Sequence, residues 1–274
     1  MDNITTLIQS ALSEEKSKGY DKTSVLEKVL GLIDLTTLEG TDSDQKVQQL
    51  CLKAVSLGDI GLGVHSVAAV CVYPVFVATA KKFLAGSKVK VAAVAGGFPS
   101  GQMALHLRVA EVAWTVEQGA DEIDMVISRG KMLSGDIDFI AKEVKDHKKA
   151  CGKAHLKVIL ETGELLSPEL IKQASEIAIA AGADFIKTST GKVKPAATLE
   201  ATWVMLHVIK DHFEKTGKKV GFKPAGGIST AEEAVDYYLL VRHVLGDQWL
   251  NPTLFRFGAS RLFDTVLKAI ADVD

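Results

Sequence analysis

The sequence predicts a (β/α)8 TIM barrel. Short apolar runs alternate with amphipathic helical patterns, the pair recurs eight times at intervals of roughly 30 residues, and several runs end in charged or small polar residues. No linker or change of composition interrupts the series, so we expect one domain over residues 1–274, with 1–30 as an N-terminal helical extension. A doubly wound sheet is the rival architecture, but its nearest glycine signature, at 61–66, precedes a strand instead of following one.

The expected strands are short apolar or β-branched runs bounded by turn residues or by a polar end. In chain order they cover 32–37, which ends in two threonines; 66–72, closed by Tyr73 and Pro74; 89–95, before a glycine-rich turn; 122–127; 155–161; a run ending at Lys187; a run ending at Lys223; and 254–257. We expect their carboxyl ends to meet at one mouth of the barrel.

The expected helices show apolar residues every three or four positions. Residues 3–30 are helical material before the first strand, and either Asp42 or Ser43 caps the helix after it. Pro168 marks a first helical position, and Ser260 opens the last helix. In chain order the remaining helices cover 75–84, 103–118, 135–150, 168–182, 198–215, 230–245 and 260–271.

Composition excludes two classes of partner. With 47% hydrophobic and 24% charged residues, the chain has enough apolar material for a sizeable core. A formal net charge of -2 gives no basic footprint for nucleic acid or for an anionic membrane. Residues 1–20 lack the apolar segment of a signal peptide, and the other apolar runs are shorter than the roughly 18 residues that span a bilayer. Three scattered cysteines favour reduced thiols, so we expect a cytoplasmic protein.

Charged side chains gather at the carboxyl ends of the expected strands, where barrels build their active sites. Any one of them is more often a solvated strand end or a buried ion pair. Three lysines and three acids that converge on one mouth are rarely a coincidence, and they favour a reaction site. The set is Asp34, Asp124, Lys157, Glu161, Lys187 and Lys223.

Two of these lysines, Lys187 and Lys223, suit amine catalysis. A lysine attacks a carbonyl only when unprotonated, and an ordinary pKa near 10.4 leaves well under one molecule in a thousand ready at pH 7. A second cation about 4 Å away, together with burial, lowers that pKa by about three units. The residues alone leave open which lysine attacks. Asp124 is expected to shuttle protons, and Lys157, inward by strand parity, to keep Asp124 ionised.

Glycine-rich loops follow the seventh and eighth strands, where barrels often bind a phosphate. They contain Gly226, Gly227 and Ser260. The glycines allow backbone N–H groups to approach an anion; alternatively, they only turn the chain. Their position favours the phosphate site.

Two further patterns are weaker. His147, Cys151 and His155 are four residues apart, but the stretch passes from a helix through Gly152 into a strand, so we expect no metal there. Cys71, near the end of the second strand, is expected to be a small apolar filler.

Seven motifs together resemble the 2-deoxyribose-5-phosphate aldolase family. They are IDLTTL at 33–38, CVYP at 71–74, ADEID at 120–124, LKVILETGE at 156–164, DFIKTSTGK at 184–192, GFKPAGG at 221–227 and FGAS at 257–260. The resemblance implies a class I lyase on a TIM barrel, with no metal or other cofactor. It also implies reversible cleavage of 2-deoxy-D-ribose 5-phosphate to acetaldehyde and D-glyceraldehyde 3-phosphate, in deoxynucleoside catabolism.

The resemblance assigns roles to individual residues. It makes Lys187 the Schiff-base lysine and gives Lys223 and Asp124 the proton transfers. The residues expected to support them are Lys157, Asp34 and Thr36. The residues expected to contact substrate or phosphate are Thr190, Gly191, Lys192, Gly226, Gly227, Ser260 and Arg261.

Two positions depart from the family pattern. Arg261 stands where many relatives carry a second small hydroxyl residue, and it either strengthens phosphate binding or points away. Residues 271–274 lack the terminal tyrosine that assists proton transfer in some relatives, so we expect that contribution to be absent or to come from elsewhere.

The resemblance suggests a homodimer that acts on small phosphorylated sugars and aldehydes. Two alternatives remain: another lysine-dependent phosphosugar aldolase, and a phosphosugar-binding barrel without turnover. The lysine–lysine–aspartate set argues against the second, because a plain anion site has no use for Asp124.

Overall fold

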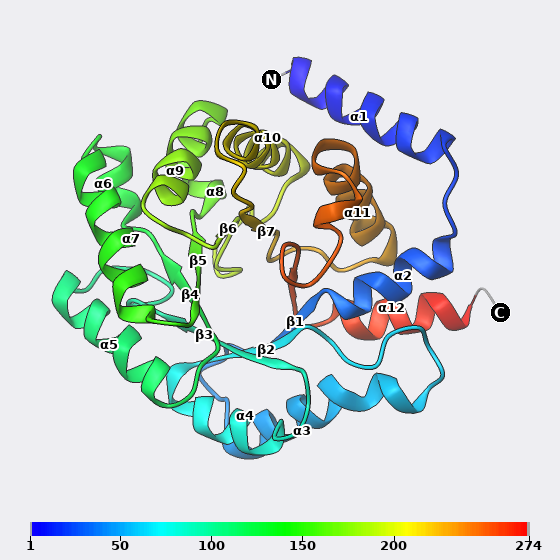
Figure 1. Cartoon of the computed structure of the whole chain (residues 1–274), viewed down its shortest axis with the longest axis horizontal. Helices are drawn as coiled ribbons and strands as arrows, with labels where there is room; N and C mark the ends of the chain where they lie inside the picture. The colour runs from blue at the N-terminus through cyan, green and yellow to red at the C-terminus, as the bar shows by residue number, and fades with distance from the viewer. Residues whose placement is uncertain (1, 273–274) are drawn as a thin grey trace.

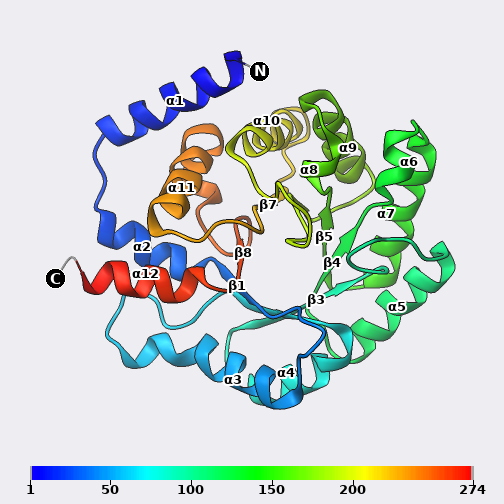
Figure 2. The same cartoon turned by 180° about the vertical axis from the view of Figure 1, so that it is seen from behind.

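Eight parallel strands form the predicted barrel, with helices around them (Figure 1, and from behind in Figure 2). The computed structural model describes residues 2–272, and the strands were identified in that range. The strands are β1 (Ile33–Thr36), β2 (Ala69–Val72), β3 (Lys90–Ala95), β4 (Glu122–Val126), β5 (His155–Ile159), β6 (Phe185–Lys187), β7 (Gly221–Lys223) and β8 (Phe257–Ala259). Most of their residues are buried, because helices cover the outer face and side chains fill the interior. This explains the continuous apolar runs of the sequence.

The barrel is nearly closed. The strands pair in the order β7-β6-β5-β4-β3-β2-β1-β8. The two ends of this series meet through the isolated bridges Phe222–Phe255 and Ala225–Gly258. The backbone N–H of Arg256 donates to Phe222 O across the seam at 3.1 Å. The inward residues of all the strands therefore share one interior.

Helices form the outer layer, and the main apolar core lies between them and the strands. The helices are α1 (Asp2–Ser17), α2 (Lys22–Gly31), α3 (Asp44–Val55), α4 (Val77–Phe83), α5 (Leu105–Glu117), α6 (Arg129–Leu133), α7 (Ile137–Cys151), α8 (Thr162–Leu165), α9 (Pro168–Ala180), α10 (Leu199–Thr216), α11 (Ala231–Leu245) and α12 (Leu262–Ala271). Short 3-10 helices are η1 (Ser56–Asp59), η2 (Pro74–Phe76) and η3 (Asp247–Trp249). None of the helices in residues 2–272 is long and apolar enough to cross a membrane.

Side-chain caps explain where two of these helices begin. Of the two candidates before α3, Ser43 is the cap, since its hydroxyl accepts a backbone N–H of the first turn at 3.3 Å. Asp42 instead accepts the hydroxyl of Thr37 at 2.8 Å. Ser167 caps α9, which begins at Pro168 as predicted.

The predicted N-terminal helical extension is divided into α1 and α2. Gly19 has a φ of 74°, a left-handed conformation that ends a helix. Asp21 then caps α2 by accepting the backbone N–H of Ser24 at 3.2 Å. The two helices therefore have different directions (Figure 1).

The predicted eighth strand was placed too early. β8 begins at Phe257, which is where pairing with β1 starts; in the preceding stretch Phe255 contributes only an isolated bridge. α12 begins at Leu262, so Ser260 does not open it. β5 ends at Ile159, two residues before the predicted end, because the backbone turns into a left-handed conformation at Glu161. The short helices α6 and α8 were not predicted.

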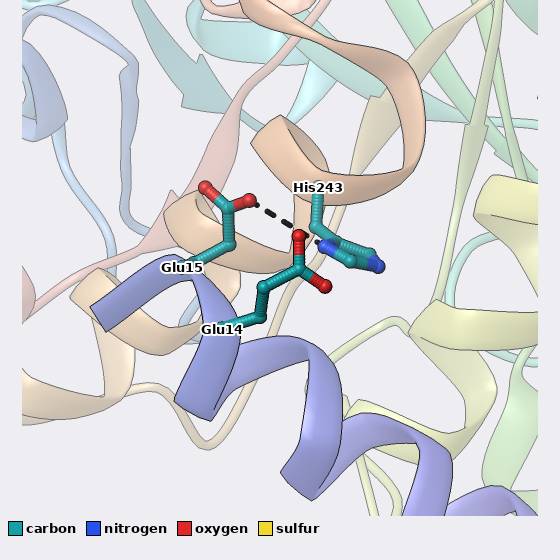
Figure 3. Close-up of side chains that lie close together, drawn as sticks. All are labelled: Glu14, Glu15 and His243. Atoms are coloured by element: carbon teal, nitrogen blue, oxygen red, sulfur yellow. Dashed lines mark ion pairs between the residues drawn. The ribbon is translucent and has the colours of Figure 1, made fainter. Parts of the chain in front are cut away.

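A buried carboxylate fastens α1 to the outside of the barrel. α1 lies beyond α10 and α11, and Glu15 on it is only 3% exposed. Glu15 accepts hydrogen bonds from Arg242 Nε at 2.6 Å and from Lys18 Nζ at 2.7 Å. Glu14 and His243 lie beside it in an arrangement that is close enough for a metal ion (Figure 3). Because two cations already neutralise Glu15, we interpret the cluster as an ion-pair clamp.

Replacing Glu15 by glutamine is expected to lower the free energy of unfolding by about 1 kcal/mol, because a charge-assisted contact becomes a neutral one while solvent still screens Arg242. Urea denaturation measures the difference. Glu14→Gln is the control, since the ion pair of Glu14 with Lys18 is exposed and screened by solvent, so its loss should move the midpoint less. A Glu15→Gln midpoint equal to that of the wild type would show that the clamp does not stabilise the fold.

Candidate active site

Alternate residues of the strands point into the barrel, and several of them are charged. Asp124 pairs in register with Lys157. On the neighbouring strands Ile159 pairs with Lys187, which in turn pairs with Lys223. The four charged residues are at most 3% exposed. Because in-register neighbours lie side by side on one face, the charges predicted at separate strand ends share the interior.

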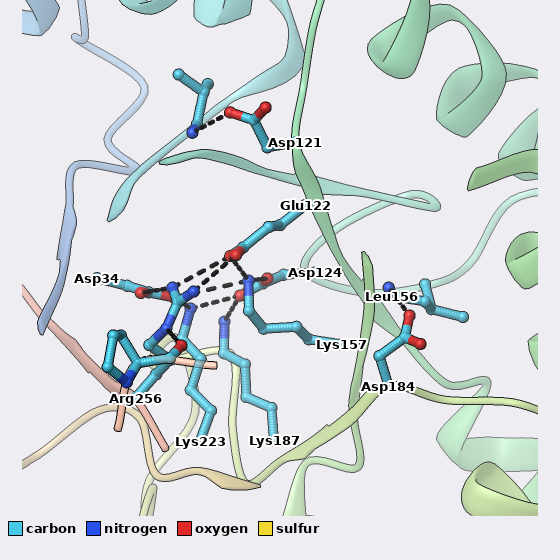
Figure 4. Close-up of polar contacts among 12 residues, drawn as sticks. Asp34, Asp121, Glu122, Asp124, Leu156, Lys157, Asp184, Lys187, Lys223 and Arg256 are labelled. Atoms are coloured by element: carbon cyan, nitrogen blue, oxygen red, sulfur yellow. Dashed lines mark hydrogen bonds and ion pairs between the residues drawn. The ribbon is translucent and has the colours of Figure 1, made fainter. Parts of the chain in front are cut away.

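Lys187 and Lys223 meet at one carboxylate oxygen. Nζ of each lysine lies 2.7 Å from Asp124 Oδ2 (Figure 4). The two nitrogens are therefore separated by no more than twice that distance. Lys223 also donates to Asp34 Oδ2 at 2.5 Å. Among the described residues, Lys187 forms an ion pair with Asp124 alone.

A second group of charges lies toward the amino ends of the strands. Lys157 donates to Asp124 Oδ1 at 3.0 Å and also bonds to Glu122. Arg256 joins Asp34 to Glu122, with contacts of 2.6 Å and 2.7 Å (Figure 4). Sequence reasoning missed Glu122 and Arg256. Glu122 was detectable, because it shares strand parity with Asp124. Arg256 lay in the run assigned to the eighth strand and gave no separate signal.

The loops after β6 and β7 touch at the mouth of the barrel. Gly191 and Gly226 have φ values of 80° and 78°. A Cβ on Gly226 would lie 2.9 Å from Gly191 Cα, so this approach requires glycine. Lys192 reaches the loop after β1, where its Nζ lies 3.1 Å from Glu39 Oε1. Its side chain therefore extends over the mouth.

The other predicted binding residues are placed less tightly. Gly227 has a φ of 85° and open space where a Cβ would be. Ser260 and Arg261 are exposed between β8 and α12, at the same edge of the barrel. Thr36 donates its hydroxyl to Asp34 O at 2.8 Å, so it is bound to its own strand. Thr190 is bound by Glu161.

Comparison with known proteins decides the family. A family model described as DeoC/LacD family aldolase matches residues 28–240. The chain belongs to the DeoC/LacD aldolase family. It is therefore a lyase, and the resemblance inferred from the seven motifs is confirmed.

Named relatives of this aldolase cover most of the chain. It is 49% identical over 258 residues to a deoxyribose-phosphate aldolase of Mus musculus and 47% identical over 258 residues to one of Homo sapiens. Each match covers 89% of this chain and 80% of the relative.

Solved structures share the barrel. An aldolase named QR15 is 31% identical, with a TM-score of 0.73 over 89% of this chain and 97% of that one. The deoxyribose phosphate aldolase of Aeropyrum pernix, described as tetrameric, has a TM-score of 0.74 over 97% of this chain and 99% of that one. At 23% identity, the second comparison shows the fold alone.

The buried charges of the aldolase do not cancel when every group is ionised. Within the network of described residues the cations are Lys157, Lys187, Lys223 and Arg256, and the acids are Asp34, Glu122 and Asp124. One positive charge is in excess in a region sealed from solvent. Burying an uncompensated charge is unfavourable, so the network favours loss of one proton.

Local contacts decide which group releases that proton. Burial lowers the pKa of Lys187, and the nearby charge of Lys223 lowers it further, although Asp124 opposes both. Burial acts in the same direction on Lys223, but Asp124 and Asp34 outweigh it and raise its pKa. Burial raises the pKa of Asp124, yet the three lysines hold it well below its usual range. Lys187 is therefore the cation most easily neutralised, beside a carboxylate that stays ionised.

Two glycines of the aldolase leave room for these side chains. A Cβ on Gly221 would lie 2.3 Å from the ring of Phe185, which fills the barrel beside Lys157 and Arg256. A Cβ on Gly258 would lie 3.0 Å from Cε of Lys223. The interior is thus packed up to the lysine stems.

The weaker sequence patterns have plain structural explanations. Cys71 is a free, fully buried thiol that packs with Ala69, Ala92 and Val94 in an apolar cluster inside the barrel, and burial raises its pKa. His147 and Cys151 are buried, whereas His155 is exposed. The candidate metal-binding group found within residues 2–272 does not include these three.

A cavity of about 490 Å³ lies at the opposite end of the barrel. His155, His212, Lys218 and Lys219 line it at the amino ends of β5–β7. The carboxyl ends of α9 and α10 lie beside it, so the charges of Lys218 and Lys219 complement the partial negative charge of those helix ends. The aldolase chemistry belongs to the lysine layer and not to this cavity.

Proposed function

We propose that this aldolase reversibly cleaves 2-deoxy-D-ribose 5-phosphate to acetaldehyde and D-glyceraldehyde 3-phosphate, in deoxynucleoside catabolism. The names of the mouse and human relatives support the substrate. The observation that carries the mechanism is the pair of lysine nitrogens on one oxygen of Asp124. Simple phosphosugar binding has no need of that arrangement.

In this proposal Lys187 is the nucleophile, because it is the network cation with the lowered pKa and has a single carboxylate partner among the described residues. Its neutral amine attacks the aldehyde carbon C1 of the open-chain sugar to form a carbinolamine. The carbinolamine hydroxyl takes up a proton from solvent through Asp124 and leaves as water, which gives an iminium ion. Once Lys187 is neutral, three cations balance three carboxylates in the network, so the neutral amine rests in a balanced site. The positive iminium lies beside Asp124, whose charge stabilises it.

The remaining steps are proton transfers. The C3 hydroxyl loses its proton to Asp124, directly or through water, as the C2–C3 bond breaks. This step releases D-glyceraldehyde 3-phosphate and leaves an enamine on Lys187. Proton return to C2 through Lys223 and Asp124 gives the acetaldehyde iminium, which water hydrolyses to acetaldehyde and the free amine. Lys157 supports this set by holding Asp124, and Asp34 by holding Lys223. Thr36 supports it through its hydrogen bond to the backbone of Asp34.

We place the phosphate at the mouth of the barrel, on the loops after β6, β7 and β8. Backbone N–H groups at positive-φ glycines are suited to an anion. Lys192 reaches over the mouth, and its one ion pair with a described residue is with the exposed Glu39, which a phosphate can replace. The residues assigned to this site are Thr190, Gly191, Lys192, Gly226, Gly227, Ser260 and Arg261.

Borohydride trapping tests the proposal. Incubation with 2-deoxyribose 5-phosphate or acetaldehyde, followed by reduction, is expected to give one stable secondary amine, located on Lys187 by peptide mass spectrometry. An adduct on Lys223 would keep the chemistry and reverse the two roles. No adduct, together with intact phosphosugar binding, would contradict the proposal. Cleavage of a different phosphosugar in a substrate panel would move the chain to another aldolase activity.

Two further properties are proposals of the same kind. We propose a homodimer, which light scattering after size exclusion distinguishes from a tetramer such as the one described for the Aeropyrum pernix protein. We propose a cytoplasmic location, where the free, buried Cys51, Cys71 and Cys151 stay reduced. Microscopy of a tagged chain checks it.

A further inference from the structure

Glu161 lies just beyond β5 in a strained conformation. Its φ of 55° and ψ of 61° are left-handed, a region that residues with long side chains rarely enter. Its side chain is fully buried. Among the described non-glycine residues, Leu166 alone shares a positive φ, and Leu166 is 82% exposed. Strain and burial at one residue require an explanation in its contacts.

The contacts of Glu161 lead to the loop after β6. Oε1 accepts the backbone N–H of Thr190 at 3.2 Å, and Oε2 accepts the hydroxyl of the same residue. The Thr190 hydroxyl oxygen in turn accepts the backbone N–H of Lys192 at 3.1 Å. A chain of hydrogen bonds therefore runs from the buried carboxylate to the lysine that extends over the mouth.

The neighbouring backbone holds the same loop. The N–H of Thr162 donates to Thr188 O at 3.0 Å. Gly163 lies so close to Pro195 that a Cβ would come within 2.0 Å of its carbonyl oxygen. With Gly191 packed on the loop after β7, the loop after β6 is held on both sides. The side chain of Glu161 fixes Thr190 and, through it, Lys192 in this loop.

The carboxylate of Glu161 is not part of the lysine network. None of the described cations forms an ion pair with it, and its hydrogen-bond donors are the N–H and hydroxyl of Thr190. A buried carboxylate without a cation is unfavourable unless its acceptors are used. Both oxygens are used, and both contacts order the loop beyond Lys187.

We propose that Glu161 is a positioning residue that holds Thr190, Gly191 and Lys192 in the shape that receives the substrate phosphate. It thereby sets the preference for 2-deoxyribose 5-phosphate over 2-deoxyribose. The inference rests on the proposed function, which places the phosphate on this loop. An ordered loop binds the phosphate without the entropy cost of fixing the loop at each turnover.

Glu161→Gly provides the test, because glycine removes the carboxylate and at the same time relieves the backbone strain. The ratio of kcat/KM for 2-deoxyribose 5-phosphate to that for 2-deoxyribose is expected to fall about tenfold or more, mainly through KM of the phosphorylated sugar. Leu166→Gly is the matched control. It relieves the same strain five residues away, at an exposed side chain, and should not change the ratio.

A double-mutant cycle tests whether Glu161 acts through Thr190. Thr190→Val removes the hydroxyl and is expected to lower the same ratio. The combination with Glu161→Gly should cost less than the sum of the single effects, because both changes break one chain. Glu161→Gln should restore most of the ratio, because its amide retains an acceptor for the Thr190 N–H. Thr190→Val alone carries the test if Glu161→Gly does not fold, because it breaks the same chain of hydrogen bonds without changing Glu161.

An unchanged ratio, equal losses with both sugars, or additive effects in the cycle would overturn the inference. Trapping with acetaldehyde separates this failure from failure of the proposed function. An adduct on Lys187 with an unchanged ratio leaves the aldolase mechanism intact and removes the role of Glu161. No adduct in the wild type removes the mechanism itself.

Discussion

Replacing Lys187 by alanine is expected to lower kcat/KM for 2-deoxyribose 5-phosphate by about 10⁴-fold or more, since no covalent intermediate can form. Stopped assays that measure acetaldehyde release quantify the loss. The fold should persist, because the change removes one of four buried cations and leaves Lys223 and Asp124 in contact. Binding of the phosphorylated sugar should remain, because the loops at the mouth are untouched.

Lys192→Met is the control for that experiment. It removes a lysine close in sequence that lies on the loop and not in the barrel interior. Its effect is expected mainly in KM, with the borohydride adduct on Lys187 retained. Substantial activity and an adduct elsewhere in Lys187→Ala would transfer the nucleophile role to another lysine.

Replacing Lys223 by leucine is expected to raise the pKa of Lys187, because a cation that lowers it is removed. In the variant, three cations face three carboxylates, so a protonated Lys187 becomes the partner that balances the network. A higher pKa leaves a smaller fraction of Lys187 neutral at pH 7, so kcat/KM there should fall about tenfold for each unit by which the pKa rises. Loss of a proton-transfer group adds to the decrease.

The pH profile distinguishes this mechanism from simple damage. In the wild type the lowered pKa of Lys187 means that activity reaches its plateau before the ordinary pKa of lysine. In Lys223→Leu, kcat/KM should rise about tenfold per pH unit as the pH approaches that pKa, because each unit increases the neutral fraction tenfold. A profile with the same acidic limb as the wild type would show that Lys223 does not control the protonation of Lys187.

Strand parity made much of the site readable from the sequence. Lys187, Lys223 and Asp124 were expected to converge because each lies near the end of a predicted strand, and the structure brings them together. Their catalytic roles stay predictions, as does the single-domain assignment. The residues alone left the two lysines equivalent. They differ because Lys223 has a second carboxylate partner, Asp34. Asp34 lies on β1, far from Lys223 in the sequence, so this contact becomes visible only in the folded chain.

The missed features depend on contacts between distant segments. Arg256 looked like one residue of an apolar strand, yet it pairs with Asp34 and Glu122 across the barrel. The start of β8 was wrong because strand pairing with β1, and not local hydrophobicity, fixes where it begins. Glu161 was identified as a strand-end charge, but its left-handed backbone and its bonds to Thr190 were not readable from parity.

Close packing of the barrel interior around Lys187 also limits redesign of the enzyme for aldehydes larger than acetaldehyde. The ring of Phe185 occupies the space that Gly221 leaves, and the stem of Lys223 occupies the space beside Gly258. A larger cavity next to Lys187 therefore requires a smaller residue in place of Phe185, which weakens the packing of the barrel, or in place of Lys223, which removes a catalytic lysine. Variants selected for larger aldehydes should therefore carry substitutions in the loops at the mouth of the barrel and keep the interior residues unchanged.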